Sequence, residues 1–104
     1  MEVITINQFE ERVLKNPKIV VLDFFANWCG PCKMLMPVLE EVENEREDVE
    51  VLKVNIDQDE ELAKQFGVLS IPTLVYFVNG EEKHKTVGYR QKSQILEVIN
   101  NIKI

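Results

Sequence analysis

Apolar residues along the chain follow two periods, which predict strands and helices in alternation. Residues 19–25 are apolar at every position but one, without alternation, as is typical of a central strand covered on both faces. Residues 49–56 are a second candidate for a buried strand, interrupted by Lys53. Residues 3–6 predict a short first strand, since β-prone side chains predominate there.

A hairpin is predicted in the second half of the chain. Residues 74–78 form an apolar strand, and the Asn79-Gly80 pair after it is a strong signal for a two-residue turn. The returning strand runs from about residue 82 to Val87, and Gly88 ends it.

Apolar residues between these runs recur at helical spacing, which predicts amphipathic helices. The first helix begins with a capping box of Asn7 and Glu10, and Asn16-Pro17 stops it. The second starts near Cys32, with an apolar face made of Met34, Leu35, Val38, Leu39 and Val42. Asp57 or Asp59 caps a short third helix, and the last helix uses Ile95, Leu96, Ile99 and Ile102.

The predicted order of elements is β-α-β-α-β-α-β-β-α. Strands that alternate with helices favour parallel pairing, whereas a hairpin is antiparallel. We therefore expect an α/β fold: a three-layer sandwich with a central mixed sheet of about five strands and helices on both faces. The 104 residues show no repeat and no linker, so we expect a single domain over residues 1–104.

Charge and hydropathy exclude several kinds of partner. The formal net charge is −6, whereas binding to double-stranded nucleic acid requires a basic surface. No apolar run approaches the length of a membrane span. Glu2 stands where a signal peptide would carry basic residues, and no apolar segment follows it. We expect a cytoplasmic protein that contacts neither membrane nor nucleic acid.

Both cysteines of the chain lie in residues 26–33, together with its one tryptophan. This segment joins the second predicted strand to the second helix, so Cys29 and Cys32 lie where a helix begins. Unpaired backbone N–H groups at a helix start favour negative charge, and a thiolate is the reactive form of cysteine. Two cysteines separated by two residues can also close into a disulfide. The segment therefore predicts a reversible dithiol/disulfide switch.

Two other functions remain open at this point. A structural zinc site needs about four ligands, and the chain offers two cysteines and the remote His84, which we interpret as a surface residue. We expect no metal and no cofactor within one chain, although a metal or cluster shared between two chains remains an alternative. The second alternative is a non-catalytic interaction module or subunit.

Several short segments resemble the thioredoxin family in order and spacing, over essentially the whole chain. They are Asp23-Phe24-Phe25-Ala26, Trp28-Cys29-Gly30-Pro31-Cys32-Lys33, Pro37, Lys53-Val54-Asn55-Ile56-Asp57, Ile71-Pro72-Thr73, Phe77, Asn79-Gly80 and Val87-Gly88. Two residues depart from the family pattern: Phe25 stands where several members have tryptophan, and Asn27 where Glu or Pro is frequent.

The resemblance implies a thioredoxin fold and a general protein-disulfide reductase that is recharged by a thioredoxin reductase. It implies target proteins of the ribonucleotide reductase, peroxiredoxin and methionine sulfoxide reductase classes. We expect the chain to act as a monomer. Gly30-Pro31 between the cysteines favours a reductant, because related isomerases and strong oxidants usually carry a histidine there.

We predict that Cys29 is the nucleophile, accessible at the helix start, and that Cys32 is the shielded resolving cysteine. Asp23 interrupts a buried strand, where a carboxylate should have a raised pKa. We interpret it as the proton acceptor for Cys32, acting through water, although a purely structural polar group is the alternative. Lys53 is either the charge partner of Asp23 or a surface lysine whose stem covers apolar surface.

By the same resemblance, Pro72 is a cis-proline that faces the two cysteines, and a trans-proline at a strand start is the alternative. The residues expected to dock substrates form an apolar patch around Cys29, since such patches usually mark contact sites. They are Trp28, Gly30, Pro31, Leu69, Ser70, Ile71, Pro72, Val87, Gly88 and Tyr89.

Overall fold

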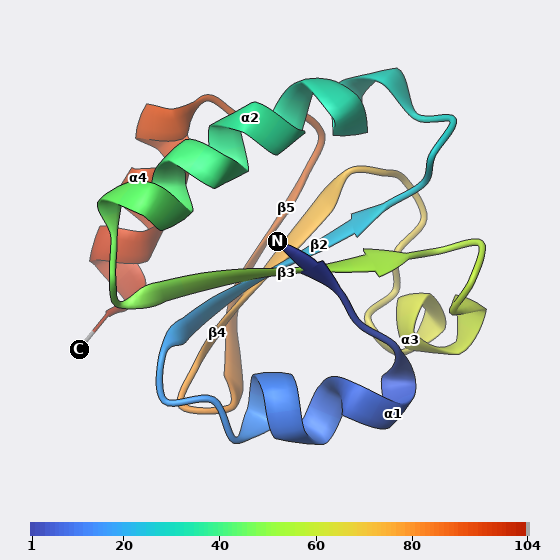
Figure 1. The fold of residues 1–104 in the computed structure, drawn as a ribbon, viewed down its shortest axis with the longest axis horizontal. Coiled ribbons are helices and arrows are strands. Elements are labelled where there is room, and N and C mark those ends of the chain that lie inside the picture. Colours follow the sequence, from blue (N-terminus) through green and yellow to red (C-terminus); the bar gives the residue numbers. More distant parts are fainter. Residues whose placement is uncertain (104) are drawn as a thin grey trace.

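The computed structural model describes residues 1–103 and consists of a five-stranded sheet with helices on both faces (Figure 1). The strand order is β1-β3-β2-β4-β5. Pairing is parallel among β1 (Glu2–Val3), β3 (Val49–Asn55) and β2 (Ile19–Phe25), and antiparallel for β4 (Thr73–Val78) and β5 (Glu81–Val87). The predicted mixed α/β sheet is therefore confirmed.

The helices form the two outer layers in Figure 1. The structure contains α1 (Ile6–Phe9), which continues into the π-helical segment η1 (Glu10–Leu14), then α2 (Gly30–Glu45), α3 (Glu60–Gln65) and α4 (Lys92–Ile102). Helices α2 and α4 lie on one face, and α1, η1 and α3 lie on the other. None of the helices within residues 1–103 combines the length and apolar character needed to cross a membrane.

Strand β2 lies at the centre of the sheet, and all seven of its residues are buried. Alternate side chains of a strand point to opposite faces, so β2 contributes to both hydrophobic cores. Val21 packs in the core under α2 and α4, whereas Val20, Leu22 and Phe24 pack in the core under α1 and α3. This explains why the run showed no alternation in the sequence.

The start of the first helix differs from the prediction. Helix α1 begins at Ile6 with Thr5 as the N-cap residue, and the Thr5 backbone N–H donates to Gln8 Oε1 over 3.1 Å. The Ile6 backbone N–H donates to Asp59 Oδ2 over 2.6 Å. Asp59 also caps α3, because its Oδ1 accepts from Leu62 N over 3.0 Å. The predicted box of Asn7 and Glu10 was wrong because the helix starts earlier, where Thr5 and Gln8 form the capping box and the distant Asp59 supplies a further acceptor.

Two further details correct the sequence interpretation. The first strand ends at Val3 rather than at Ile6, which is already helical. Met34 was placed on the buried face of the second helix, but its side chain is 64% exposed. The helix starts at Gly30 and buries Leu35, Leu39 and Val42, a stripe that leaves Met34 facing solvent.

The β4–β5 hairpin turns at Asn79 and Gly80, with φ values of 51° and 79°. Positive φ at both central residues matches the right-handed twist of the two strands. A Cβ atom on Gly80 would lie 2.5 Å from the carbonyl oxygen of Leu14. Glycine is therefore required here both by the turn and by the close approach of η1.

Candidate active site

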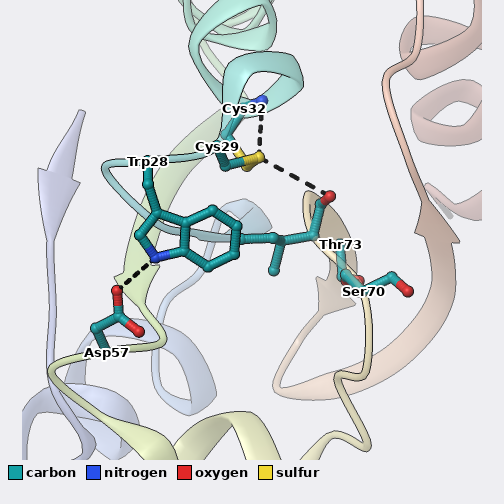
Figure 2. The surroundings of a disulfide bond; sticks show 7 residues. Trp28, Cys29, Cys32, Asp57, Ser70 and Thr73 are labelled. Atoms are coloured by element: carbon teal, nitrogen blue, oxygen red, sulfur yellow. Dashed lines mark hydrogen bonds between the residues drawn. A yellow bond between two sulfur atoms is a disulfide. The ribbon is translucent and has the colours of Figure 1, made fainter.

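The two cysteines occupy the junction between β2 and α2. Cys29 is the N-cap residue of α2, and the backbone N–H of Cys32 donates to Cys29 Sγ over 3.2 Å (Figure 2). Gly30 and Pro31 form the first turn, where the missing N–H of proline leaves no intrahelical bond unmade. A disulfide joins Cys29 to Cys32. The helix start thus directs a backbone donor at the first sulfur, as the sequence predicted.

The two sulfurs face different surroundings. Cys29 Sγ lies 3.9 Å from the carbonyl oxygen of Ile71, whereas Cys32 lines a cavity of about 280 Å³ under the start of α2. Cys29 is 5% exposed and Cys32 is 2% exposed, so the accessibility expected for Cys29 is slight in the disulfide form. The cavity is lined by Val3, Phe25, Ala26, Asn27, Cys32, Lys33, Met36 and Lys53.

The loop before β4 forms the other side of the site. The Ile71–Pro72 peptide bond is cis, as predicted from the family resemblance. The Pro72 carbonyl accepts from the backbone N–H of Gly88 over 2.7 Å, and the Thr73 hydroxyl donates to the Ser70 carbonyl over 2.6 Å. The first bond joins the segment before β4 to the end of β5 beside Cys29, and the second holds the turn before β4.

Large apolar side chains are exposed around Cys29. They belong to the surface that the sequence predicts to dock substrates, which we name the docking surface. Leu69 is 97% exposed, Trp28 69%, Val87 50% and Tyr89 39%. Leu69 and Val87 are therefore surface residues and not parts of the core. The docking surface consists of Trp28, Gly30, Pro31, Leu69, Ser70, Ile71, Pro72, Val87, Gly88 and Tyr89.

The exposed indole of Trp28 is held by a residue that the sequence did not assign to the site. Trp28 Nε1 donates to Asp57 Oδ2 over 2.9 Å, and Figure 2 shows the ring turned toward that carboxylate. The sequence suggested Asp57 only as a helix cap and as part of a family segment. Its place after the second buried strand was the available signal, because β2 and β3 are parallel and their carboxyl ends meet at one edge.

Asp23 is fully buried in β2, and neither of its carboxylate oxygens has a hydrogen-bond partner among the described residues. Burial raises the pKa of this carboxyl from 3.8 to about 7, although the positive charge of Lys53 lowers it in part. Asp23 can therefore exchange a proton near neutral pH, which is the property that a base for a thiol requires.

Lys53 is 6% exposed, so the surface-lysine alternative was wrong. It is the register partner of Asp23 across the β2–β3 pair. Its ammonium lies 4.1 Å from the centroid of the Phe25 ring, and no ion pair joins it to Asp23 in the part of the chain that the structure describes. The charge of Lys53 therefore acts on the pKa of Asp23 without a hydrogen bond between the two side chains.

His84 lies in β5 and is exposed, with its ring edge against Tyr76. Strand β5 is two places from β2 in the sheet order, whereas the cysteines follow the end of β2. Within residues 1–103, no three or more His, Cys, Asp and Glu side chains are grouped so as to hold a metal ion.

A disulfide-forming cysteine pair at the start of a helix, beside a cis-proline and under an apolar rim, defines a thiol–disulfide oxidoreductase. The sequence model of the thioredoxin family matches residues 1–101. The chain is 48% identical over 99 residues to the thioredoxin of Rickettsia bellii, covering 94% of each chain. It is 51% identical over 82 residues to that of Chlamydia caviae, covering 79% of this chain and 80% of the relative. The chain belongs to the thioredoxin family.

Proposed function

We propose that this chain is a general reductant of protein disulfides that reacts first through Cys29 and releases its substrate through Cys32. The position of Cys29 as the N-cap of α2 carries this proposal. Negative charge on Cys29 Sγ is stabilised by the helix start and by the N–H of Cys32. Cys32 lies on the cavity side of the helix start and does not meet the substrate first.

The proposed reaction has two exchanges. The Cys29 thiolate attacks one sulfur of a substrate disulfide, the substrate S–S bond breaks, and its other sulfur leaves as a thiolate that takes up a proton. Cys32 then loses its proton and attacks Cys29 Sγ, so the mixed disulfide breaks and the second substrate thiol is released. Two electrons pass to the substrate, and Cys29 and Cys32 end as the disulfide.

Asp23 is the proposed acceptor of the Cys32 proton in the second exchange, acting through water. A carboxyl with a pKa of about 7 is matched to proton transfer at neutral pH. Its burial and its lack of hydrogen-bond partners within residues 1–103 support a chemical role rather than a structural one.

The docking surface is proposed to receive an extended segment of the substrate. Pro72 and Gly88 keep bulky side chains away from the path to Cys29, and Trp28, Leu69, Ile71, Val87 and Tyr89 supply apolar contact area. The main chain around Ser70 and Ile71 can also pair with an extended peptide. Such recognition does not depend on one side chain of the substrate, which suits a general reductant.

Membership of the thioredoxin family implies disulfide-containing substrates and recycling by a reductase. We propose a thioredoxin reductase as the electron donor, and targets of the ribonucleotide reductase, peroxiredoxin and methionine sulfoxide reductase classes. The proposed working form is a monomer, and the proposed location is the cytoplasm, where thiols are kept reduced between turnovers.

An insulin-turbidity assay with dithiothreitol tests the proposed function. The unmodified chain should accelerate insulin precipitation, and Cys29→Ser should give only the rate of dithiothreitol alone. Cys32→Ser should retain the first exchange and accumulate mixed disulfides with its targets. Alkylation of the reduced chain at neutral pH should label Cys29 before Cys32.

The alternatives give different results in the same experiments. An interaction module would leave the turbidity rate at the background level with or without Cys29. A metal or cluster shared between two chains would appear as a metal-containing dimer that loses its metal in Cys29→Ser. Labelling of Cys32 before Cys29 would reverse the proposed roles.

A further inference from the structure

We propose that Phe25 is a positioning residue for Lys53: its ring holds the lysine ammonium and prevents a direct ion pair with Asp23. Asp23 is then left without a hydrogen-bonding partner, in a state in which it can accept a proton. The functional consequence rests on the proposed role of Asp23, whereas the positioning itself does not.

The register of the sheet brings the three side chains to one face. Asp23 and Phe25 are alternate residues of β2 and therefore point to the same side. Lys53 is directly opposite Asp23 on the neighbouring parallel strand, and in-register neighbours share a face. That face is the one covered by α2, since Phe25, Lys53 and Cys32 all line the same cavity.

The contact between Lys53 and Phe25 is close, and both residues are largely buried. The ammonium lies 4.1 Å from the ring centroid, and the two residues are 6% and 8% exposed. A cation over an aromatic face is attracted by the ring quadrupole, most strongly where water is excluded. A buried ammonium next to a buried carboxylate would ordinarily form an ion pair, yet both oxygens of Asp23 are without a partner in residues 1–103.

Few other charged groups surround Asp23, so the position of Lys53 has a large influence on it. Strand β4 places Leu74 opposite Asp23, and β1 places Val3 opposite Lys53. The adjacent Glu2 is ion-paired to Arg12 at 2.8 Å. Helix α2 contributes Cys32 and Lys33 to the cavity wall. Among the charged groups of residues 1–103, Lys53 is the one that acts on the pKa of Asp23, and no hydrogen bond joins it to the carboxyl.

Removal of the aromatic ring should therefore release Lys53 toward Asp23. A hydrogen-bonded ion pair favours the ionised carboxylate, so Asp23 would lose its proton at lower pH and become a weaker base. Phe25→Leu keeps an apolar side chain at the site but has no aromatic face. Phe25→Trp keeps the aromatic face and is the matched control.

The test measures the Asp23 titration by carboxyl ¹³C NMR in the disulfide form, in which the cysteines do not titrate. We expect the Asp23 midpoint of Phe25→Leu to fall by about one pH unit, a tenfold change in the protonation ratio, and that of Phe25→Trp to stay near the unmodified value. In a Lys53→Met background, Phe25→Leu should leave the midpoint unchanged. If the leucine variant does not fold, Phe25→Met replaces it.

The proposal would be overturned if Phe25→Leu displaced the Asp23 midpoint equally with Lys53 present and in the Lys53→Met background. The Phe25 ring would then act on Asp23 through burial alone. An unchanged or higher midpoint in Phe25→Leu would overturn it as well.

The release of thionitrobenzoate from Ellman's reagent separates this proposal from the role of Asp23. Its second phase reports the attack of Cys32 on the mixed disulfide, and its pH profile should follow the NMR midpoint in every variant. A displaced midpoint with an unchanged profile would support the positioning by Phe25 and contradict the role of Asp23 as proton acceptor.

Discussion

The two faces of the central sheet are built from the same strands but differ in chemistry. Under α1, η1 and α3, the buried residues of β2 and β3 are all apolar: Val20, Leu22, Phe24, Leu52 and Val54. Under α2 and α4, the same two strands bury Asp23, Lys53 and Asn55 beside apolar neighbours. The polar residues lie toward the carboxyl ends of the strands, where β2 leads into the cysteines.

This difference adds reactive groups to one face of the sheet only. Both faces contribute the hydrophobic effect and close packing, since each covers a core. The face under α2 and α4 includes a carboxyl whose burial is unfavourable, at the end of the sheet where a thiol must be deprotonated. A protein selected for stability alone would place an apolar residue at position 23.

The largest effect on the free energy of unfolding is expected from a cavity in the apolar face. Phe24 is fully buried, and its ring centroid lies 6.0 Å from that of Phe66. Phe24→Ala should lower the free energy of unfolding by about 3–5 kcal/mol, because it leaves a cavity and loses aromatic contacts. Urea denaturation measures this loss, and the insulin assay on the folded variant should show unchanged turnover. Leu14→Ala, at a site 40% exposed, is the control and should change stability by about 0.5 kcal/mol or less.

The next prediction concerns Asp23, on the face covered by α2 and α4, and its replacement Asp23→Asn. The Asp23 carboxyl has a pKa of about 7 in the folded chain and 3.8 as its ordinary value. Between these values the folded chain holds a proton that the unfolded chain has lost, so stability declines as the pH rises and is level above about pH 7. The decline attributable to Asp23 is about 4 kcal/mol in total. Asp23→Asn should remove it and slow the release of mixed disulfides.

Urea titrations of both proteins at pH 4 and pH 8 measure that difference. The stability of Asp23→Asn relative to the unmodified chain should be greater at pH 8 than at pH 4. Parallel pH dependence in the two proteins would show that Asp23 titrates normally, and would contradict its assignment to the second exchange.

A smaller effect on the free energy of unfolding is expected from the loss of Asp59. Asp59 accepts from the backbone N–H groups of Ile6 and Leu62, which start α1 and α3. Asp59→Ala should lower the unfolding free energy by about 1–3 kcal/mol, because two helix starts lose an acceptor. Thermal or urea unfolding measures the loss, with the exposed neighbour Glu60→Ala as control. A decrease no larger than that of the control would show that water replaces both bonds.

The smallest effect is expected from the loss of Asp57, whose carboxylate holds Trp28 in the docking surface. Asp57→Ala removes the acceptor of the Trp28 indole N–H while it leaves the ring in place. A single hydrogen bond contributes about 0.5–1.5 kcal/mol, so we expect roughly a two- to twelvefold increase in KM for a protein disulfide and little change in kcat. Steady-state kinetics distinguish the two parameters. A decrease confined to kcat would show that Asp57 acts on the chemistry and not on docking.

Local patterns in the sequence were enough to predict the order of elements and the location of the reactive pair. A continuous apolar run predicted β2, an interrupted one predicted β3, and Asn79-Gly80 predicted the hairpin. The position of Cys29 between an apolar run and a helical pattern predicted a cysteine at a helix start. These features depend on residues close together in the chain, where periodicity and local backbone preferences decide the structure. The cis state of Pro72 was predicted only through the family resemblance.

The tertiary structure alone decided how distant residues meet. It showed that Asp59 caps two helices, that Asp57 holds Trp28, and that Lys53 lies over Phe25 without a hydrogen bond to Asp23. The sequence left Lys53 open between a charge partner and a surface residue, since a lysine in an apolar run fits both. The register of β3 against β2 and the packing of α2 above them settled its position. Contacts between strands depend on register and packing, which no local pattern specifies.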